Sequence, residues 1–366
     1  MKPRRLFPLL ALMLTAALLA ALPLALRPAA DIPGLTPARR TLLRVWVTSA
    51  PGGAQAWLTQ QLRAFEKQHP GVMTHLRIVS PEEFSSPDAV LPDIVLCMPG
   101  DLHNLAAFFT PISADDALLE PLLQSGRCQG EQYGLPLCWG AWVLAVDSAL
   151  DPVSAATPAP TTLLGRPSAT PAPQEALPYP LAAASQADCP LLSPGGTALF
   201  ALSSLLPPDS RPPLPEDFAR HTAQEVYAAF QARRCVSAML TTGQATAFSA
   251  LVSGGGGFPF RILVPEEIVT DQVWLAHLTP DAPGEAAELL AFLTGRQAQQ
   301  ALSAQGLHTV RDDVQLYASG FSAQVEEAAR RSLSAVNAYL PVDTVQSAAW
   351  QALHQADWRS ALPPLL

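Results

Sequence analysis

Side chains that could do chemistry are few and scattered in this 366-residue chain. The signatures of a serine hydrolase (G-x-S-x-G), a zinc protease (H-E-x-x-H), a dinucleotide-binding turn (G-x-G-x-x-G) and a phosphate-binding loop (G-x-x-x-x-G-K-[ST]) are all absent. None of the seven histidines has a second histidine four residues away, so a helical metal pair is not expected. We therefore expect no catalytic residues, no metal site and no cofactor.

Polar side chains do follow two apolar strands in the first third of the chain. Thr48 and Ser49 come directly after the strand expected at 42–47, and Asp101 follows the strand expected at 91–98. Ligand sites of parallel sheets lie beyond the carboxyl ends of the strands, where hydroxyls and a carboxylate can bind a polar solute. Alternatively, Thr48 and Ser49 cap the helix that follows them, and Asp101 caps a helix from Leu102.

The elements that must position these side chains follow from hydrophobic periodicity. Leu58, Leu62 and Phe65 fall on one face of a helix, and its neighbours are apolar runs typical of strands. The expected strands are 42–47, 72–79 and 91–98, around a helix at 54–68. This strand–helix–strand spacing favours a parallel sheet. Later elements are expected as helices at 101–109, 222–233, 285–293, 321–339 and 345–357, with a further helix after a break at 294–295 that runs to residue 305. A turn followed by a long strand is expected over 131–146, and further strands at 260–264 and 272–277.

The first 30 residues have the pattern of an export signal or a membrane anchor. Lys2, Arg4 and Arg5 precede an apolar run over 6–26 that is long enough to cross a bilayer. A clean A-x-A cleavage site is missing, so we favour a retained anchor, with 31–41 as a tether. Whether the segment is cleaved stays open.

The five cysteines form no C-x-x-C pair, which disfavours zinc and thioredoxin-like chemistry. An exported chain can form disulfides, and the odd count leaves at least one free thiol. Cys128 and Cys138 flank one tight loop and are the favoured pair, although the pairing stays open. The cysteines are Cys97, Cys128, Cys138, Cys189 and Cys235.

Composition favours a folded chain and disfavours nucleic-acid binding. The chain is 49% hydrophobic, which supports a large core, and only 14% charged, against about 25% in a typical domain. The net charge is −9, and no block of Lys and Arg interrupts it. Nucleic acid is therefore not an expected partner. Eight prolines fall between 151 and 180, so that segment is expected to be irregular.

Three stretches, taken in order, resemble a known family. The first is LRVWVTSAPGGAQAWLTQQLRAFEKQHPGV at 43–72. The second combines LPDIVLCMPGDLHNLAAFFTPI at 91–112 with GEQYGLPLCWGAWVLAVDSALD at 130–151, and the third combines 233–248 with 286–314. Together they resemble extracellular solute-binding proteins of the family that includes the maltose-type sugar binders of ABC importers.

The resemblance implies an α/β, two-lobe periplasmic-binding-protein-like (type II) fold with hinge strands and interleaved chain segments. Lobe one would hold 42–140 plus 258–316, and lobe two 141–257 plus 317–366. The implied function is capture of a small solute, with a sugar or oligosaccharide favoured, outside the membrane. Delivery would be to the transmembrane permease of an ABC transporter, by a monomeric protein held to the membrane by its N-terminal segment.

The resemblance also implies further ligand-binding residues. Besides Thr48, Ser49 and Asp101, they are Trp139 and Trp142 in the hinge strand, Thr242 and Gln244 in lobe two, and the late Trp350. At least one of the two hinge tryptophans is expected in the core. Trp139 and Trp142 face the same side only if the strand is twisted or bulged, because they are three residues apart.

Two other functions stay open. One is a binding or sensor module of the same fold without transport, which a retained anchor would suit. The other is an extracytoplasmic enzyme on the same scaffold, which the lack of paired acids, bases or nucleophiles disfavours.

Overall fold

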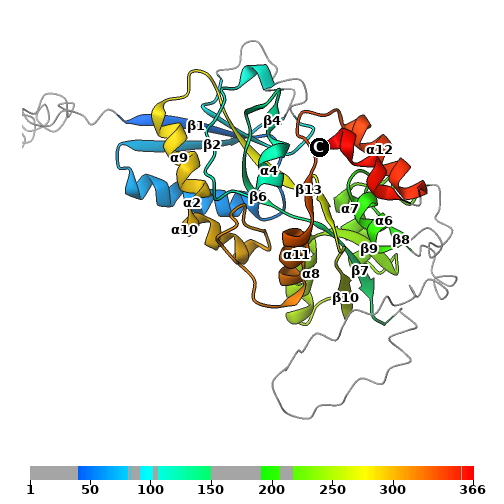
Figure 1. Cartoon of the computed structure of the whole chain (residues 1–366). Helices are drawn as coiled ribbons and strands as arrows, with labels where there is room; N and C mark the ends of the chain where they lie inside the picture. Colours follow the sequence, from blue (N-terminus) through cyan, green and yellow to red (C-terminus); the bar gives the residue numbers. More distant parts are fainter. Residues whose placement is uncertain are drawn as a thin grey trace, which may run out of the picture.

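The computed structural model describes residues 40–80, 83, 91–101, 106–149, 191–206, 217–355 and 357–366. The predicted N-terminal anchor, most of the tether, Cys189 and the proline-rich segment lie outside this range. Within it, no helix combines the length and apolar character needed to cross a membrane. Figure 1 shows two α/β lobes, the first built around the blue strands and the second around the green ones.

The first lobe is built on a five-stranded sheet with the order β2-β1-β3-β12-β6. Strands β1, β2 and β3 are parallel, and β12 runs antiparallel between β3 and β6. Their bounds are β1 Thr41–Val47, β2 Val72–Ile78, β3 Ile94–Cys97, β12 Val273–Leu278 and β6 Leu135–Trp139. The predicted parallel arrangement of the first three strands is therefore confirmed.

Helices cover this sheet with the apolar faces that the sequence predicts. Helix α2 (Ala54–Gln68) buries Leu58, Leu62 and Phe65, the three residues of the predicted stripe. Helix α9 (Gly284–Thr294) packs beside it, where Phe292 meets Phe65 edge to face at 5.5 Å between ring centroids. Shorter helices are α4 (Glu120–Ser125) and α10 (Arg296–Gln300), with 3₁₀ turns at Ala106–Phe108 and Ala301–Gln305.

The second lobe is built on a four-stranded sheet with the order β10-β7-β9-β8. The strands are β10 Phe260–Leu263, β7 Trp142–Asp147, β9 Ser237–Thr241 and β8 Leu191–Leu192. Apolar clusters lie on both of its faces. One contains α6 (Ala198–Leu205) and α12 (Val342–His354), and the other contains residues of α7 (Ala223–Gln231) and α8 (Thr242–Ser253). Burial on both faces explains why β7 is apolar along its length.

The chain crosses between the sheets at Gly140 and Ala141, and returns through β11 (Ile268–Thr270) and Gln272. The two crossings are hydrogen-bonded to each other. The Gly140 amide donates to the Gln272 carbonyl at 2.8 Å, and Thr270 Oγ1 donates to the Gly140 carbonyl at 2.7 Å. β11 also pairs in parallel with β13 (Leu333–Ala335), which follows α11 (Gly320–Arg331).

Three expectations from the sequence differ from the structure. The long strand expected within 131–146 is interrupted at Gly140, so β6 and β7 belong to different sheets. The helix expected at 321–339 ends at Arg331, because residues 333–335 pair with β11 and this long-range pairing overrides the helical pattern. Strand β10 pairs with β7 in the second sheet, whereas the expected lobe one includes 258–316.

The expected Cys128–Cys138 disulfide is wrong, because both thiols are free. Cys128 lies in the two-residue strand β4 (Arg127–Cys128), which pairs with β5 (Glu131–Gln132) through a turn at Gln129 and Gly130. Cys138 is fully buried in β6, and burial raises the pKa of its thiol. Cys97 and Cys235 are also free and buried.

Candidate functional site

Thr48, Ser49 and Asp101 lie together at the carboxyl ends of β1 and β3. One carboxylate oxygen of Asp101 accepts hydrogen bonds from Thr48 Oγ1 at 2.9 Å, from Ser49 Oγ, and from the Met98 amide at 3.2 Å. The sheet brings these residues close although about 50 positions separate them in the chain. Helix α2 takes Gly53 as its N-cap without a side-chain bond, so neither hydroxyl caps it.

Next to this cluster, the loop after β3 closes against the segment before α12. The Gly100 amide donates to the Ala338 carbonyl at 3.0 Å. Gly100 has φ +93°, and a Cβ atom there would lie 2.8 Å from a methyl of Val342, so only glycine fits without movement. This close approach joins the first lobe to the chain segment that leads into the second lobe's last helix.

A cavity of about 80 Å³ remains between these elements. Its walls come from the loop after β3, the turn before α6, Asp271 of the returning crossing, and the start of α12. The lining residues are Pro99, Gly100, Gly196, Asp271, Val336, Asn337, Leu340, Val342, Val345 and Gln346. Small-molecule sites typically measure about 300–1,000 Å³, so this interlobe cavity holds only a few waters at its present size.

The far wall of the interlobe cavity is polar. Gln346 Oε1 accepts the Gly196 amide at 2.6 Å, which places the glutamine side chain at the turn before α6. The Asp271 carboxylate accepts the Trp142 indole N–H at 3.0 Å and the Gln272 side-chain amide at 2.9 Å. Gly196, Asp271 and Gln346 were missed by sequence reasoning. The only local signal was the Pro-Gly-Gly turn at 194–196 before an apolar helix.

The two hinge tryptophans point to different places. Trp142 is 4% exposed in the core of the second lobe, and its indole N–H also donates to Thr197 Oγ1 at 2.8 Å. Trp139 is 1% exposed in the core of the first lobe, and its N–H donates to the Thr309 carbonyl at 2.8 Å. Neither ring offers an open face to the interlobe cavity, which differs from the expected role of these residues.

The other expected ligand residues also make hydrogen bonds or packing contacts within the protein. Thr242 is fully buried, and its Oγ1 accepts the Ala141 amide at 3.3 Å. Gln244 completes a capping box with Thr241 at the start of α8, and its side-chain amide donates to the Ala223 carbonyl. Trp350 packs edge to face on Phe218, with ring centroids 5.8 Å apart. The structure therefore brings together three of the eight expected residues.

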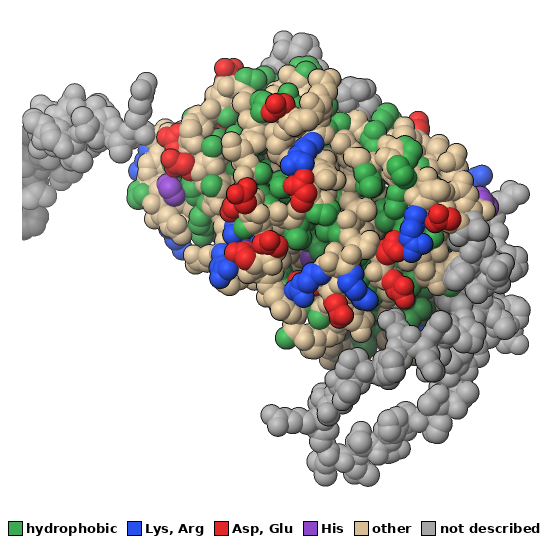
Figure 2. Space-filling model, viewed as in Figure 1, with side chains coloured by type: hydrophobic (Ala, Val, Ile, Leu, Met, Phe, Trp, Pro, Cys, Tyr) green, Lys and Arg blue, Asp and Glu red, His purple; other side chains and the backbone are tan. Residues whose placement is uncertain are grey.

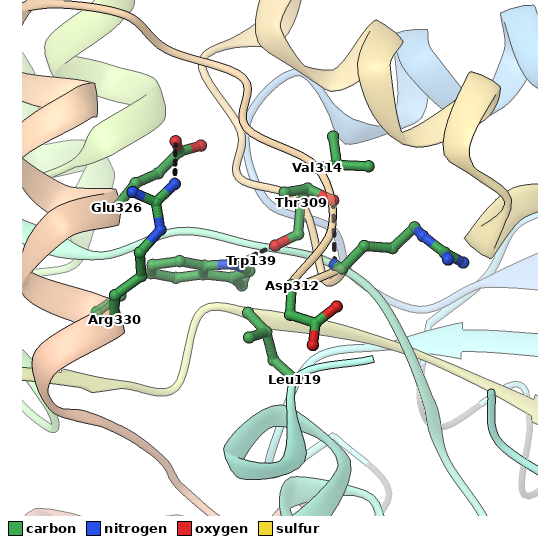
Figure 3. Close-up of a pocket in the computed structure, with 9 residues that line it drawn as sticks. Leu119, Trp139, Thr309, Asp312, Val314, Glu326 and Arg330 are labelled. Atoms are coloured by element: carbon green, nitrogen blue, oxygen red, sulfur yellow. Dashed lines mark hydrogen bonds and ion pairs between the residues drawn. The ribbon is translucent and has the colours of Figure 1, made fainter. Parts of the chain in front are cut away.

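A second cavity, of about 270 Å³, lies between the segment 309–314 and helix α11 (Figure 3). Leu119, Trp139, Val314 and Ala329 give it apolar walls, and Thr309, Arg311, Asp312, Glu326 and Arg330 give it polar ones. It shares no lining residue with the interlobe cavity. The two cavities are therefore distinct sites.

Charge is mixed on the surface that Figure 2 shows, where acidic and basic side chains alternate over both lobes. Among the described residues, no group of three or more His, Cys, Asp or Glu side chains is placed to hold a metal ion.

Comparisons with known proteins identify the fold. No family model matches the chain, and no curated protein matches its sequence. Among solved structures, the GacH receptor of Streptomyces glaucescens, studied with acarbose, is similar with a TM-score of 0.62 and 12% identity, over 88% of this chain and 96% of that one. A mannotriose-bound protein, CpMnBP1, has a TM-score of 0.59 and 14% identity, over 88% and 96% of the two chains.

The maltose-bound MalE3 of T. maritima has a TM-score of 0.57 and 16% identity, over 87% of this chain and 97% of that one. These proteins are described with acarbose, mannotriose or maltose, and their structural likeness to this chain confirms the expected fold class.

Proposed function

We propose that this protein is an extracytoplasmic solute-binding protein that takes a small solute between its lobes and delivers it to an ABC transporter permease. The observation that carries the proposal is the joining of Thr48, Ser49 and Asp101 at the carboxyl ends of β1 and β3. They lie beside the loop of Pro99 and Gly100 that lines the interlobe cavity, in a fold shared with a protein described with acarbose. A sugar or oligosaccharide is the favoured solute, because three similar structures are described with acarbose, mannotriose or maltose.

The mechanism we propose is hinge closure. A solute selects the closed form only through contacts that the open form cannot make. Sugar hydroxyls would donate to Asp101 on one lobe and exchange hydrogen bonds with Asp271 and Gln346 on the other. Because the interlobe cavity measures only about 80 Å³, the lobes must separate and Gln346 must leave the Gly196 amide before a saccharide enters.

The remaining parts of the proposal concern the setting of the protein. We propose that the apolar run over 6–26 exports the chain and holds it to the membrane, with the lobes outside as a monomer. We also propose no enzymatic turnover, because the residues that line the interlobe cavity include no serine, threonine, cysteine or lysine nucleophile.

A sensor or binding module without transport is the second candidate. It is favoured by the positions of Trp139, Trp142 and Trp350, none of which lines the interlobe cavity, so these rings offer no sugar platform there. One similar structure is described as a two-component system protein in signal transduction, with a TM-score of 0.51 and 17% identity over 77% of this chain.

A thermal-shift screen with maltotriose, mannotriose and acarbose tests the proposal. A saccharide at about 100 times its Kd stabilises the folded state by about 2.7 kcal/mol. Asp101→Asn should remove the shift, whereas Asp116→Asn, an exposed acid on the same lobe, should keep it. A binding saccharide whose uptake is unchanged by deletion of the gene would favour the sensor, and a saccharide that is consumed would favour an enzyme.

A further inference from the structure

The cavity between residues 309–314 and α11 contains a buried acid that accepts no hydrogen bond. The Glu326 side chain is 7% exposed, and neither of its carboxylate oxygens has a hydrogen-bond partner. The nearest positive or titratable groups are His308 Nδ1 at 3.6 Å and Arg330 Nη2 at 3.9 Å, both too far for a good hydrogen bond. A buried acceptor without a donor is costly, so a partner is expected there.

His308 does not supply that partner at neutral pH. Its ring is fully buried between Trp139 and Tyr317, and both ring nitrogens lack a hydrogen bond. Burial lowers the pKa of His308, and the nearby Glu326 only partly offsets this effect. The imidazole is therefore neutral at pH 7 and adds no positive charge beside Glu326.

Neither arginine of this cavity donates a hydrogen bond to Glu326. Arg311 donates to Asp115 at 2.9 Å and to Asp313 at 2.7 Å, so its guanidinium is already paired. The Arg330 side chain is 53% exposed and forms only a long ion pair with Glu326, with 3.9 Å between Nη2 and Oε2 (Figure 3). A ligand that brings its own positive charge would displace the exposed Arg330 and meet acceptor atoms that have no hydrogen-bond donor.

The walls define the rest of that ligand. Trp139, Leu119 and Val314 offer apolar surface, and the volume of about 270 Å³ is just under the usual range for small-molecule sites. We propose that this cavity is a second ligand site, for a small organic cation whose protonated amine donates to Glu326 while its apolar body lies against Trp139. The site is independent of the interlobe solute site, because the two share no residue.

Calorimetric titration of the full chain with benzylammonium chloride tests this proposal, with benzyl alcohol as the neutral isostere. We expect saturable binding of the ammonium and at least about tenfold weaker binding of the alcohol, because hydrogen bonds to charged groups contribute about 1.5–3 kcal/mol. Glu326→Gln should weaken the binding of benzylammonium by a similar factor. Glu327→Gln removes an exposed charge from the same helix outside the cavity lining and should change the Kd less than about twofold.

Ala329→Leu provides a second test that leaves Glu326 in place. The larger side chain would fill part of the cavity and should abolish benzylammonium binding, while a saccharide bound between the lobes should keep its affinity. Equal binding of amine and alcohol, undiminished binding to Glu326→Gln or Ala329→Leu, or no binding of either probe would overturn the proposal. None of these outcomes depends on the solute site.

Discussion

Gln346 lies with its Oε1 atom 2.6 Å from the amide nitrogen of Gly196, so the last long helix holds the turn that opens α6. This bond fixes one wall of the interlobe cavity from within the second lobe. It also engages the Gly196 N–H at the start of α6. A solute oxygen could otherwise accept a hydrogen bond from this group.

Replacement of Gln346 by Ala should lower the free energy of unfolding by about 1 kcal/mol, because one hydrogen bond is lost. Under the proposed function, the variant should also bind its saccharide about fivefold more weakly, since the solute loses its hydrogen bonds with the Gln346 side chain. Urea denaturation and titration measure the two effects. Gln351→Ala on the exposed face of α12 should change stability by less than about 0.5 kcal/mol.

Asp101→Asn should destabilise the first lobe by about 1–3 kcal/mol. One carboxylate oxygen accepts from Thr48, Ser49 and Met98 together, and the neutral amide oxygen of asparagine would accept these three hydrogen bonds more weakly. Chemical denaturation measures the change. Asp116→Asn is the matched control, because Asp116 is exposed on the same lobe. Equal stabilities of the two variants would contradict the role given to Asp101.

Trp142→Phe should destabilise the protein more than Trp358→Phe, by about 1–2 kcal/mol. The Trp142 indole N–H serves both Thr197 Oγ1 and Asp271 Oδ1. Its loss leaves the fully buried Thr197 Oγ1 without this donor, whereas Asp271 Oδ1 keeps the Gln272 side-chain amide. Trp358 is also buried and contacts Phe200, but its indole N–H has no hydrogen-bond partner among the described residues. Guanidinium unfolding of both variants gives the comparison, and a smaller effect at Trp142 would refute it.

Stability should fall as the pH drops from about 6.5 towards 4. Burial lowers the pKa of His277 to about 4, so the unfolded chain binds a proton in this window that the folded protein resists. The loss should approach about 3 kcal/mol at the low end, because one pKa unit corresponds to about 1.4 kcal/mol. Above pH 7 this contribution is fully present and constant.

Urea unfolding between pH 7.5 and 4.5 measures the slope. His277→Gln removes the titrating group and should flatten it, even if the variant is less stable at pH 7.5, where it loses the contact with Tyr339. His354→Gln, at an exposed position on α12, should keep the wild-type slope. The buried His308, whose pKa is also lowered, should leave a smaller residual slope in His277→Gln.

Helix periodicity and the positions of strand ends in the sequence predicted the parts of the fold that depend on neighbouring residues. The stripe of Leu58, Leu62 and Phe65 predicted α2 with its full length, and the strand-end rule predicted that Thr48 and Asp101 meet. Gln346 escaped prediction because its partner lies 150 residues earlier and only helix packing brings them together. No local periodicity carries that information.

The two hinge tryptophans show a second limit of prediction from the sequence. An apolar strand reveals that it is buried but not which lobe covers each face, so Trp139 and Trp142 could not be assigned to separate cores before the crossing at Gly140 was known. Gln244 did carry a signal. Threonine at 241 followed by glutamine three residues later is a capping-box pattern, which the structure contains.

The position of β12 in the first sheet has a consequence for biosynthesis. This strand fills the gap between β3 and β6, so the middle of that sheet stays unpaired until residue 278 has left the ribosome. During most of translation, β3 presents an open apolar edge of the kind that aggregates. The nascent chain therefore needs either a holding chaperone or prompt translocation, and a version truncated before residue 273 should be insoluble rather than half folded.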